Sequence, residues 1–386
     1  MSDPKPAQSS ESIFVNAFRL TARQWAWAFA LAVIGVFATP RLWTKLERFD
    51  TGPDFRIPYQ LSKDYWLYER RLRGIDDPTK IVLLGDSVVW GEYVLPDGTL
   101  SHFLNKEASH ADQFINGGVN GLFPLALEGL VNDYGRSLHD RKVLLHCNVL
   151  WMSNPKADLR VTKEEKFNYA QLVPQFSPRI PCYRADASER LSAVIERNVT
   201  FMAWVNHLQS AYYDDRSIPA WTLVDDGGDP PRYPNSYKFP LKQIALTVPS
   251  APRDDPQRGT GSSRHQPWTS TIKSPTQFEW VDLETSLQWG AFRRLVETLR
   301  ARGNKVLVVL GPFNEHIIAE ASLPPYRKMT SDIQSWLKGS NVLTVAPLVL
   351  PSELYADASH PLTQGYELLA RKLYEEPTFQ KWLKAE

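Results

Sequence analysis

The chain has 386 residues, of which 43% are apolar and 23% are charged. This composition excludes an intrinsically disordered protein, and the length suffices for one large domain with insertions or for two modest ones. The formal net charge is +1, so no basic excess points to a nucleic-acid partner.

An uncharged apolar run occupies residues 25–38, between Arg23 and Arg41. The run alone is short for a bilayer span, which needs about 20 residues, but residues 24–43 reach that length with tryptophans near both ends. We therefore predict a polar N-terminal segment, 1–23, followed by an uncleaved membrane anchor.

Two other interpretations of the apolar run stay open. Residues 36–38, Val-Phe-Ala, fit the cleavage site of a signal peptide, which would give a secreted or periplasmic protein. The run also fits a buried helix. Because the anchor is single and N-terminal, we place the rest of the chain outside the cytoplasm, attached to the membrane through residues 24–43.

Residues 44–78 are a charged, aromatic-rich connector, and we expect its Tyr59, Tyr65, Trp66 and Tyr68 to pack on the main domain. Residues 79–386 have the pattern of an α/β domain. Short apolar runs alternate there with helical segments, which is typical of a parallel sheet. Strands are expected at 80–84, 113–116, 142–149, 305–310 and 341–345, and helices at 99–108, 122–138, 189–207, 283–302, 325–337 and 362–374. Five strands with helices between them predict a three-layer α/β/α sandwich.

The regular pattern is interrupted between residues 152 and 280, which carry much of the Pro and Trp of the chain. We interpret this segment as an insertion or cap, with a loop at 248–274. The two cysteines, Cys147 and Cys182, form no zinc motif and no disulfide framework, although a single bridge between them stays open.

Two short motifs near opposite ends of this domain carry the chemistry. Gly85-Asp86-Ser87 directly follows a buried strand, so Ser87 is expected at the carboxyl edge of the sheet, where open α/β folds hold their ligands. Asp357 and His360 lie three residues apart before a helix. A serine hydroxyl becomes nucleophilic when an imidazole accepts its proton and a carboxylate orients that imidazole.

With these motifs the chain resembles the SGNH/GDSL hydrolase superfamily, over residues 80–150 and 300–375. The resemblance implies a flavodoxin-like sandwich with a mainly parallel five-stranded sheet. It also implies that Ser87 is the nucleophile, that His360 is the general base and that Asp357 orients the base.

The other two sequence blocks of the family imply an oxyanion hole. Residues 116–121, Asn-Gly-Gly-Val-Asn-Gly, fit the second block, so the backbone N–H of Gly118 joins that of Ser87 as a donor. Asn148 fits the asparagine of the third block, but the glycine and the second acid of that block are missing here. Asn154 is a competing assignment for the same role.

Three further residues are candidates for substrate contact. Asn314 and His316 follow a strand directly, so they are expected at the same edge of the sheet as Ser87. Trp90 is a candidate for stacking on a sugar ring. The alternatives are packing in the core for Trp90 and loop scaffolding for Asn314 and His316. Asp86 is expected to hold its turn through backbone N–H groups. No cluster of His and acidic residues has metal-ligand spacing, so we expect neither a metal nor another cofactor.

The resemblance implies a serine esterase that removes acetyl or short acyl groups, with a carbohydrate ester as the expected substrate. An O-acetyltransferase that acts on extracellular polysaccharide would use the same triad, and the anchor favours this alternative. A non-catalytic carbohydrate-binding protein of the same fold is the third alternative, favoured by the departures beside Asn148.

Overall fold

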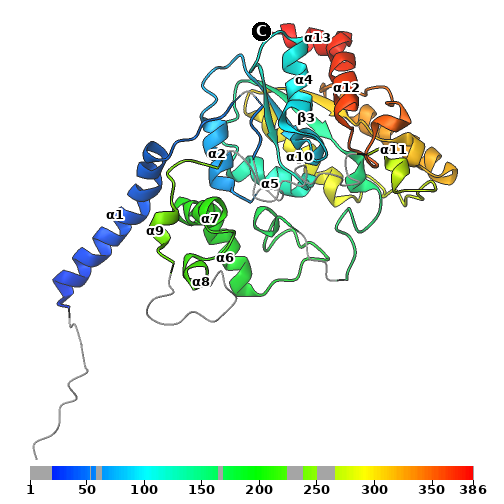
Figure 1. Cartoon of the computed structure of the whole chain (residues 1–386). Coiled ribbons are helices and arrows are strands. Elements are labelled where there is room, and N and C mark those ends of the chain that lie inside the picture. Colours follow the sequence, from blue (N-terminus) through cyan, green and yellow to red (C-terminus); the bar gives the residue numbers. More distant parts are fainter. Residues whose placement is uncertain are drawn as a thin grey trace, which may run out of the picture.

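The computed structural model describes residues 20–52, 54–57, 63–163, 168–223, 238–249 and 266–385. Most of the expected polar segment 1–23, Tyr59 of the connector and the centre of the expected loop 248–274 therefore lie outside the described residues. Figure 1 shows a globular body from which one long helix, α1, projects.

The centre of the body is a five-stranded sheet in which every neighbouring pair is parallel. The strand order is β2-β1-β3-β4-β5, one of the common orders of doubly wound sheets. Its strands are β1 (Ile81–Gly85), β2 (Phe114–Gly118), β3 (Lys142–Cys147), β4 (Lys305–Leu310) and β5 (Leu343–Val345). All five predicted strands are confirmed, with ends that differ by at most two residues.

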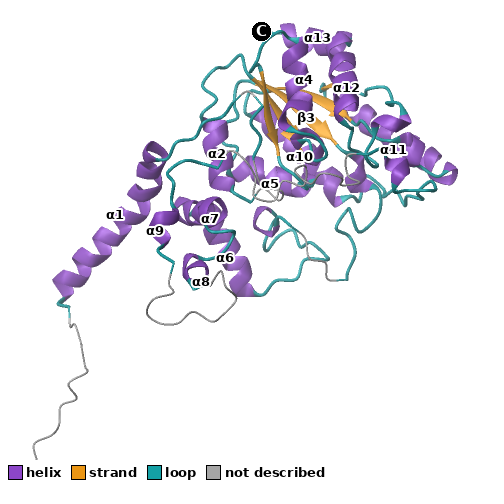
Figure 2. Cartoon of the chain, in the orientation of Figure 1, coloured by secondary structure: helices purple, strands orange, loops and turns teal. Residues whose placement is uncertain are grey.

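Helices lie on both sides of this sheet (Figure 2). One group consists of α4 (Leu100–Glu107), α12 (Thr363–Glu375) and α13 (Pro377–Lys384), and the other of α5 (Pro124–Asp133) and α10 (Leu287–Ala301). α11 (Leu323–Gly339) packs against the edge strand β5. The arrangement is an α/β fold compatible with three layers.

The strands consist of apolar residues because the sheet is covered on both faces. Every residue of β1 is buried, as are all but the first residue of β3 and of β4. A parallel strand buried on two sides is typically a continuous run of branched aliphatic side chains, as in Val-Leu-Val-Val-Leu of β4.

The insertion folds into helices that pack beside the sheet domain. They are α6 (Ala187–Asn198), α7 (Thr200–Tyr212), α8 (Ile218–Thr222) and α9 (Pro240–Gln243). The single helix expected at 189–207 is wrong, because Val199 takes an extended conformation between α6 and α7. The β-branched pair Val199 and Thr200 follows Asn198, and all three residue types have low helix propensity.

The connector contains the helix α2 (Tyr65–Arg73), which was not predicted. Its N-cap is Asp64, whose carboxylate accepts the N–H of Leu67 at 2.9 Å. Four apolar or aromatic residues at its start are buried. The connector is therefore part of the packed body rather than a tether.

α1 (Ala22–Leu46) is long and apolar enough to cross a membrane, and among the described helices no other meets both conditions. A signal sequence would also satisfy them. The alternative of a buried helix is wrong, because Pro40 is the only residue of α1 that is buried. The cysteine bridge left open by the sequence does not form, since Cys147 and Cys182 are both free and buried.

Candidate active site

Ser87 lies at the carboxyl edge of the sheet, where β1 turns into the short helix α3 (Ser87–Trp90). Asp86 is the N-cap of this helix and accepts the N–H of Val88 at 3.0 Å. Gly91 ends the helix with φ +87°, a conformation that favours glycine. The chain therefore reverses its direction within one helical turn, and Ser87 lies just beyond the carboxyl end of β1.

The loop that carries Asp357 and His360 is fixed by its own carboxylate. Asp357 Oδ1 accepts the backbone N–H groups of Ser359 and His360, each at 2.9 Å. Asn314, which follows β4, donates its side-chain N–H to the Asp357 carbonyl at 3.1 Å and its backbone N–H to the Ala358 carbonyl at 2.9 Å. Segments that follow β4 and β5 thus position the imidazole against the serine that follows β1.

The three residues form a continuous hydrogen-bonded chain. His360 Nε2 lies 2.7 Å from Ser87 Oγ, and His360 Nδ1 lies 2.8 Å from each carboxylate oxygen of Asp357. Ser87 and His360 are both buried. The structure thus brings together, at this edge of the sheet, two residues that are 273 positions apart in the sequence.

Opposing effects act on the pKa of His360. Burial of the ring lowers its pKa, whereas the charge of Asp357 and the hydrogen bond to it raise the pKa. The carboxylates of Glu92 and Asp86 add to the increase, and the balance places the pKa of His360 at about 9. Burial also raises the pKa of Asp357, but the charge of His360 and three hydrogen bonds outweigh it and lower the pKa.

Asp86 is the hub of a second buried network behind the serine. Its Oδ2 accepts the side-chain N–H groups of Asn148 at 2.7 Å and Trp151 at 2.8 Å. Its Oδ1 lies 3.3 Å from His146 Nδ1. Burial raises the pKa of Asp86, but the contact with His146, the charge of His360 and the bond from Trp151 lower the pKa to about 2. Asp86 therefore stays ionised. It holds the turn, as expected, and in addition it binds the side chains of Asn148 and Trp151.

The three expected oxyanion donors differ in availability. The N–H of Ser87, at the first position of α3, has no partner among the described residues. Asn148 uses one of its two amide hydrogens on Asp86, which leaves the second for a ligand. The N–H of Gly118 donates to Asn116 Oδ1 at 3.0 Å, so in this structure it does not act as an oxyanion donor. Asn154, the competing assignment, caps a turn through Lys156 and Ala157.

Two of the three residues considered for substrate contact are enclosed. Trp90 is 0% exposed, with its indole N–H on the Ile57 carbonyl at 2.7 Å and the Arg56 guanidinium 3.9 Å from its ring centroid. Asn314 is also 0% exposed and braces the Asp357 loop. Substrate contact by Trp90 and by Asn314 is therefore wrong, because neither side chain offers a face to a substrate. The alternatives hold instead, with Trp90 packed in the core and Asn314 acting as loop scaffolding. His316 is exposed, and its Nε2 lies 3.1 Å from the Leu350 carbonyl.

Two residues beside the triad were missed from the sequence. Glu92 Oε2 lies 3.6 Å from His360 Nε2, and the Tyr93 ring meets the imidazole edge-on with 5.1 Å between centroids. Both follow the reversal at Gly91, which returns the chain across Ser87. A glycine four residues after the serine was the signal available in the sequence, since it allows such a reversal.

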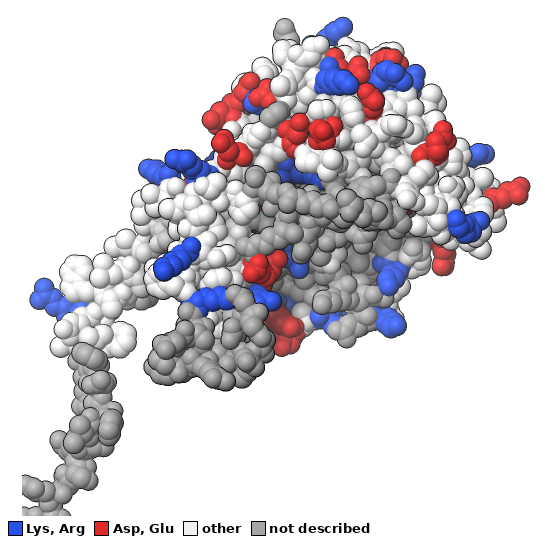
Figure 3. Space-filling model, viewed as in Figure 1, with Lys and Arg blue, Asp and Glu red and all other residues white. Residues whose placement is uncertain are grey.

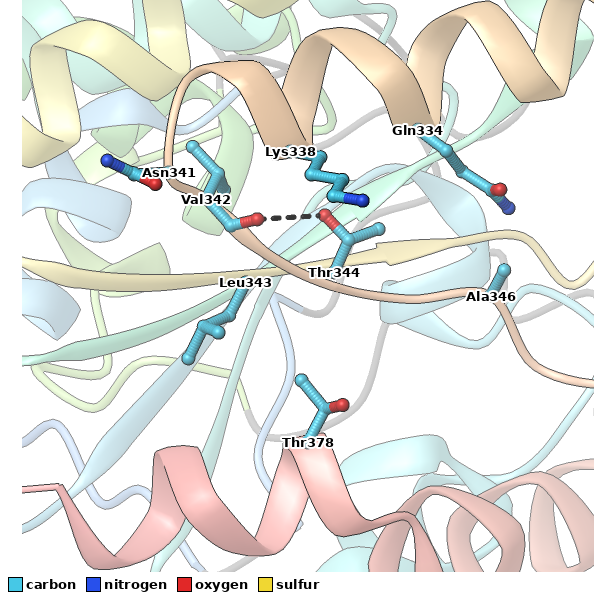
Figure 4. A pocket seen from close by; sticks show the side chains of 8 residues that line it. All are labelled: Gln334, Lys338, Asn341, Val342, Leu343, Thr344, Ala346 and Thr378. Atoms are coloured by element: carbon cyan, nitrogen blue, oxygen red, sulfur yellow. Dashed lines mark hydrogen bonds between the residues drawn. The ribbon is translucent and has the colours of Figure 1, made fainter.

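One cavity on the described surface lies away from the triad. It measures about 550 Å³ and lies at the β5 edge, between the ends of α11 and α13 (Figure 4). Gln334, Lys338 and Thr378 line it, and Thr344 donates to the Val342 carbonyl at 3.2 Å. No residue of the triad lines this cavity. Within the described ranges, no group of three or more His, Cys, Asp or Glu side chains could hold a metal ion.

Comparison of the chain with protein-family models and with curated proteins gives no match. The interpretation of the site therefore depends on the arrangement of its own atoms. A hydroxyl, an imidazole and a carboxylate in series, together with N–H donors for a negative oxygen, are the parts that acyl transfer requires.

Proposed function

We propose that this chain is a serine esterase of the SGNH/GDSL type that removes acetyl or short acyl groups from an ester substrate, with an acylated carbohydrate as the favoured class. The observation that carries the proposal is the distance of 2.7 Å between Ser87 Oγ and His360 Nε2, with Asp357 2.8 Å from the other ring nitrogen. If Ser87, Asp357 and His360 only capped turns, their side chains would not have to form one hydrogen-bonded chain.

In the proposed reaction, Ser87 Oγ attacks the ester carbonyl while its proton passes to His360 Nε2. The negative oxygen of the tetrahedral intermediate accepts the Ser87 N–H and the second amide hydrogen of Asn148. His360 then gives its proton to the leaving alkoxide, and an acyl-enzyme remains on Ser87. In the second half-reaction His360 removes a proton from water, the hydroxide attacks the acyl group, and Ser87 regains its proton as the acid leaves.

A second candidate is an O-acyltransferase, in which a sugar hydroxyl takes the place of water. Two observations favour it. α1 suits a membrane anchor of an extracytoplasmic enzyme, and Glu92 Oε2 lies 3.6 Å from His360 Nε2. In the second half-reaction the attacking sugar hydroxyl must lie close to His360 Nε2. The Glu92 carboxylate can then accept a hydrogen bond from another hydroxyl of the same sugar and so help to position the acceptor.

The test is an acetyl-ester assay with and without an oligosaccharide acceptor. The esterase proposal predicts that acetate is released without acceptor, that Ser87→Ala abolishes release, and that Ser137→Ala leaves it unchanged. Ser137 lies before β3, and its hydroxyl has no partner among the described residues. Acetylated oligosaccharide with little acetate would support the transferase. Absence of both products with folded protein would support the non-catalytic carbohydrate-binding alternative and contradict the proposal.

A further inference from the structure

The exposed face of α1 is apolar over most of its length. Trp25, Trp27, Phe29, Leu31, Ile34, Phe37 and Leu42 are all exposed. In Figure 3 the projecting part of α1 is white, with Lys and Arg only near its two ends. A helix of 25 residues is about 37 Å long, enough for a hydrocarbon core of about 30 Å.

The end of α1 is fixed to the insertion rather than joined to it by a flexible linker. The Trp43 ring meets the Trp204 ring of α7 edge-on at 5.6 Å. Just beyond the helix, Arg48 pairs with the segment after α9, since its N–H donates to the Leu246 carbonyl at 2.9 Å and its carbonyl accepts the Val248 N–H at 2.9 Å. The insertion helices therefore keep a set position beside the point where α1 leaves the body.

The insertion presents its own exposed apolar side chains at this point. We name them the α9 patch, which consists of Leu223, Phe239, Leu241 and Leu246. Leu241 is 67% exposed, as much as the 65% of Leu31 in α1. In Figure 1, α9 lies beside the end of α1 that joins the body, in agreement with the pairing of Arg48 with Leu246 and Val248.

Cations accompany the α9 patch. Lys242 of α9 is exposed, and its Nζ lies 5.9 Å from the Phe239 ring centroid. Lys45, in the last turn of α1, is exposed as well. Aromatic and leucine side chains next to lysines are the composition of interfacial membrane helices, in which the apolar groups enter the acyl boundary and the ammonium groups meet anionic headgroups.

We propose that the α9 patch is a second membrane contact, which lies in the headgroup and acyl boundary of the bilayer that α1 enters. The occupant is the lipid surface, because Leu246 of the patch pairs with Arg48, two residues beyond a helix of membrane-spanning length, and because Lys242 of α9 complements anionic lipids. Two contacts fix the tilt of the body on the membrane, whereas one helix alone would leave it free to pivot. The inference depends on α1 as an anchor and is independent of the chemistry at Ser87.

Site-specific quenching in vesicles tests this contact with the full chain. Single cysteines are introduced at Leu241, at Leu31 in α1 and at Leu348 near β5, and each is labelled with an environment-sensitive fluorophore. Leu348 is 78% exposed and so matches Leu241 in exposure. Cys147 and Cys182 are buried, so the parent chain serves as the unlabelled blank. The vesicles contain phosphatidylcholine with about one-third phosphatidylglycerol, and the quencher is a nitroxide lipid.

The proposal predicts that the nitroxide lipid quenches the label at position 241 several-fold more than the label at 348. Quenching at 31 with none at 241 would overturn the α9 contact and leave the anchor intact. A label at 241 that is shielded from a water-soluble quencher but not reached by the lipid quencher would indicate a second copy of the chain, and would also overturn the proposal. Absence of quenching at both 31 and 241 would overturn the anchor and the patch together.

Discussion

The carboxylates around His360 decide at which pH the site can work. A histidine with a pKa of about 9 carries a proton on both ring nitrogens at neutral pH, and in that state Nε2 cannot accept the proton of Ser87. Asp357 is the largest of the groups that raise the pKa, and Glu92 and Asp86 follow. The neutral imidazole becomes available only as the pH rises towards the pKa of His360.

Replacing Glu92 by Gln removes one negative charge near Nε2 and keeps the shape of the side chain. Because that charge stabilises the imidazolium, its loss lowers the pKa of His360, so the neutral base forms at lower pH. We expect the rate of ester cleavage to rise with pH through about 9 in the parent chain, and at a lower pH in Glu92→Gln. The measurement is the pH profile of kcat/KM, with Glu284→Gln, an exposed position, as the control. Identical profiles for Glu92→Gln and the parent would contradict this role.

At the scale of elements, the reversal after α3 positions both Ser87 and Glu92. Gly91 allows it, because its φ of +87° is unfavourable for other residues and a Cβ there would lie 2.7 Å from Thr99 Cγ2. The turn is also held from outside, since Tyr366 of α12 donates its hydroxyl to the Val88 carbonyl at 2.7 Å and Asn116 of β2 donates to the Val89 carbonyl at 2.9 Å.

Gly91→Ala is therefore expected to lower the free energy of unfolding by about 1–3 kcal/mol, because it adds backbone strain and a steric contact. Gly290→Ala is the matched control. Gly290 lies inside α10, where a Cβ would meet only Arg294 Nη1 at 3.5 Å, so the same substitution is expected to stabilise by about 0.5–1 kcal/mol. Urea denaturation measures the free energy of unfolding of both variants. An equal change in that free energy for Gly91→Ala and Gly290→Ala would contradict the role of the backbone conformation at Gly91.

The sequence predicted the sheet well because each strand is a compact apolar run with clear ends. The meeting of Ser87 with Asp357 and His360 was expected for two reasons: Ser87 follows a strand and so lies at the carboxyl edge of the sheet, and the two motifs together resemble a known family of hydrolases. Packing was the expected alternative for Trp90, but its partners could not be predicted, since Arg56 and Ile57 of the connector are distant in sequence. Packing of Tyr65, Trp66 and Tyr68 on the domain was expected, but the helix α2 that carries them was missed, because its charged residues mask the apolar face of the helix.

On the scale of the whole molecule, a buried ionic cluster joins α1 to the body. His207 of α7 is enclosed, with Nδ1 2.7 Å from Asp64 Oδ2 and Nε2 3.0 Å from Glu47 Oε1. Arg70 of α2 donates to Glu47 Oε2 at 2.6 Å. Burial lowers the pKa of His207, but the charge of Asp64 and the hydrogen bonds to Asp64 and Glu47 outweigh it and raise the pKa to about 9. The cluster thus joins the C-cap of α1, the N-cap of α2 and the middle of α7.

Because the pKa of His207 is higher in the folded chain than the 6.5 of an ordinary histidine, protonation stabilises the fold. This contribution is complete below pH 6.5 and is lost as the pH rises through about 9. We expect His207→Gln to lower the free energy of unfolding by about 3 kcal/mol near pH 6, with a difference from the parent that shrinks towards pH 10. His139→Gln, at an exposed histidine, should change stability by less than about 0.5 kcal/mol. Chemical denaturation at several pH values measures this, and a difference independent of pH would contradict the cluster's role.

The central claim is that Ser87 is activated by His360, and covalent labelling tests it most directly. The full chain is incubated with a fluorophosphonate at a pH near 9, digested and mapped by mass spectrometry. The account predicts one adduct, on the peptide that contains Ser87, and no adduct in Ser87→Ala. A folded parent chain that stays unlabelled, or that is labelled at another serine, would contradict it.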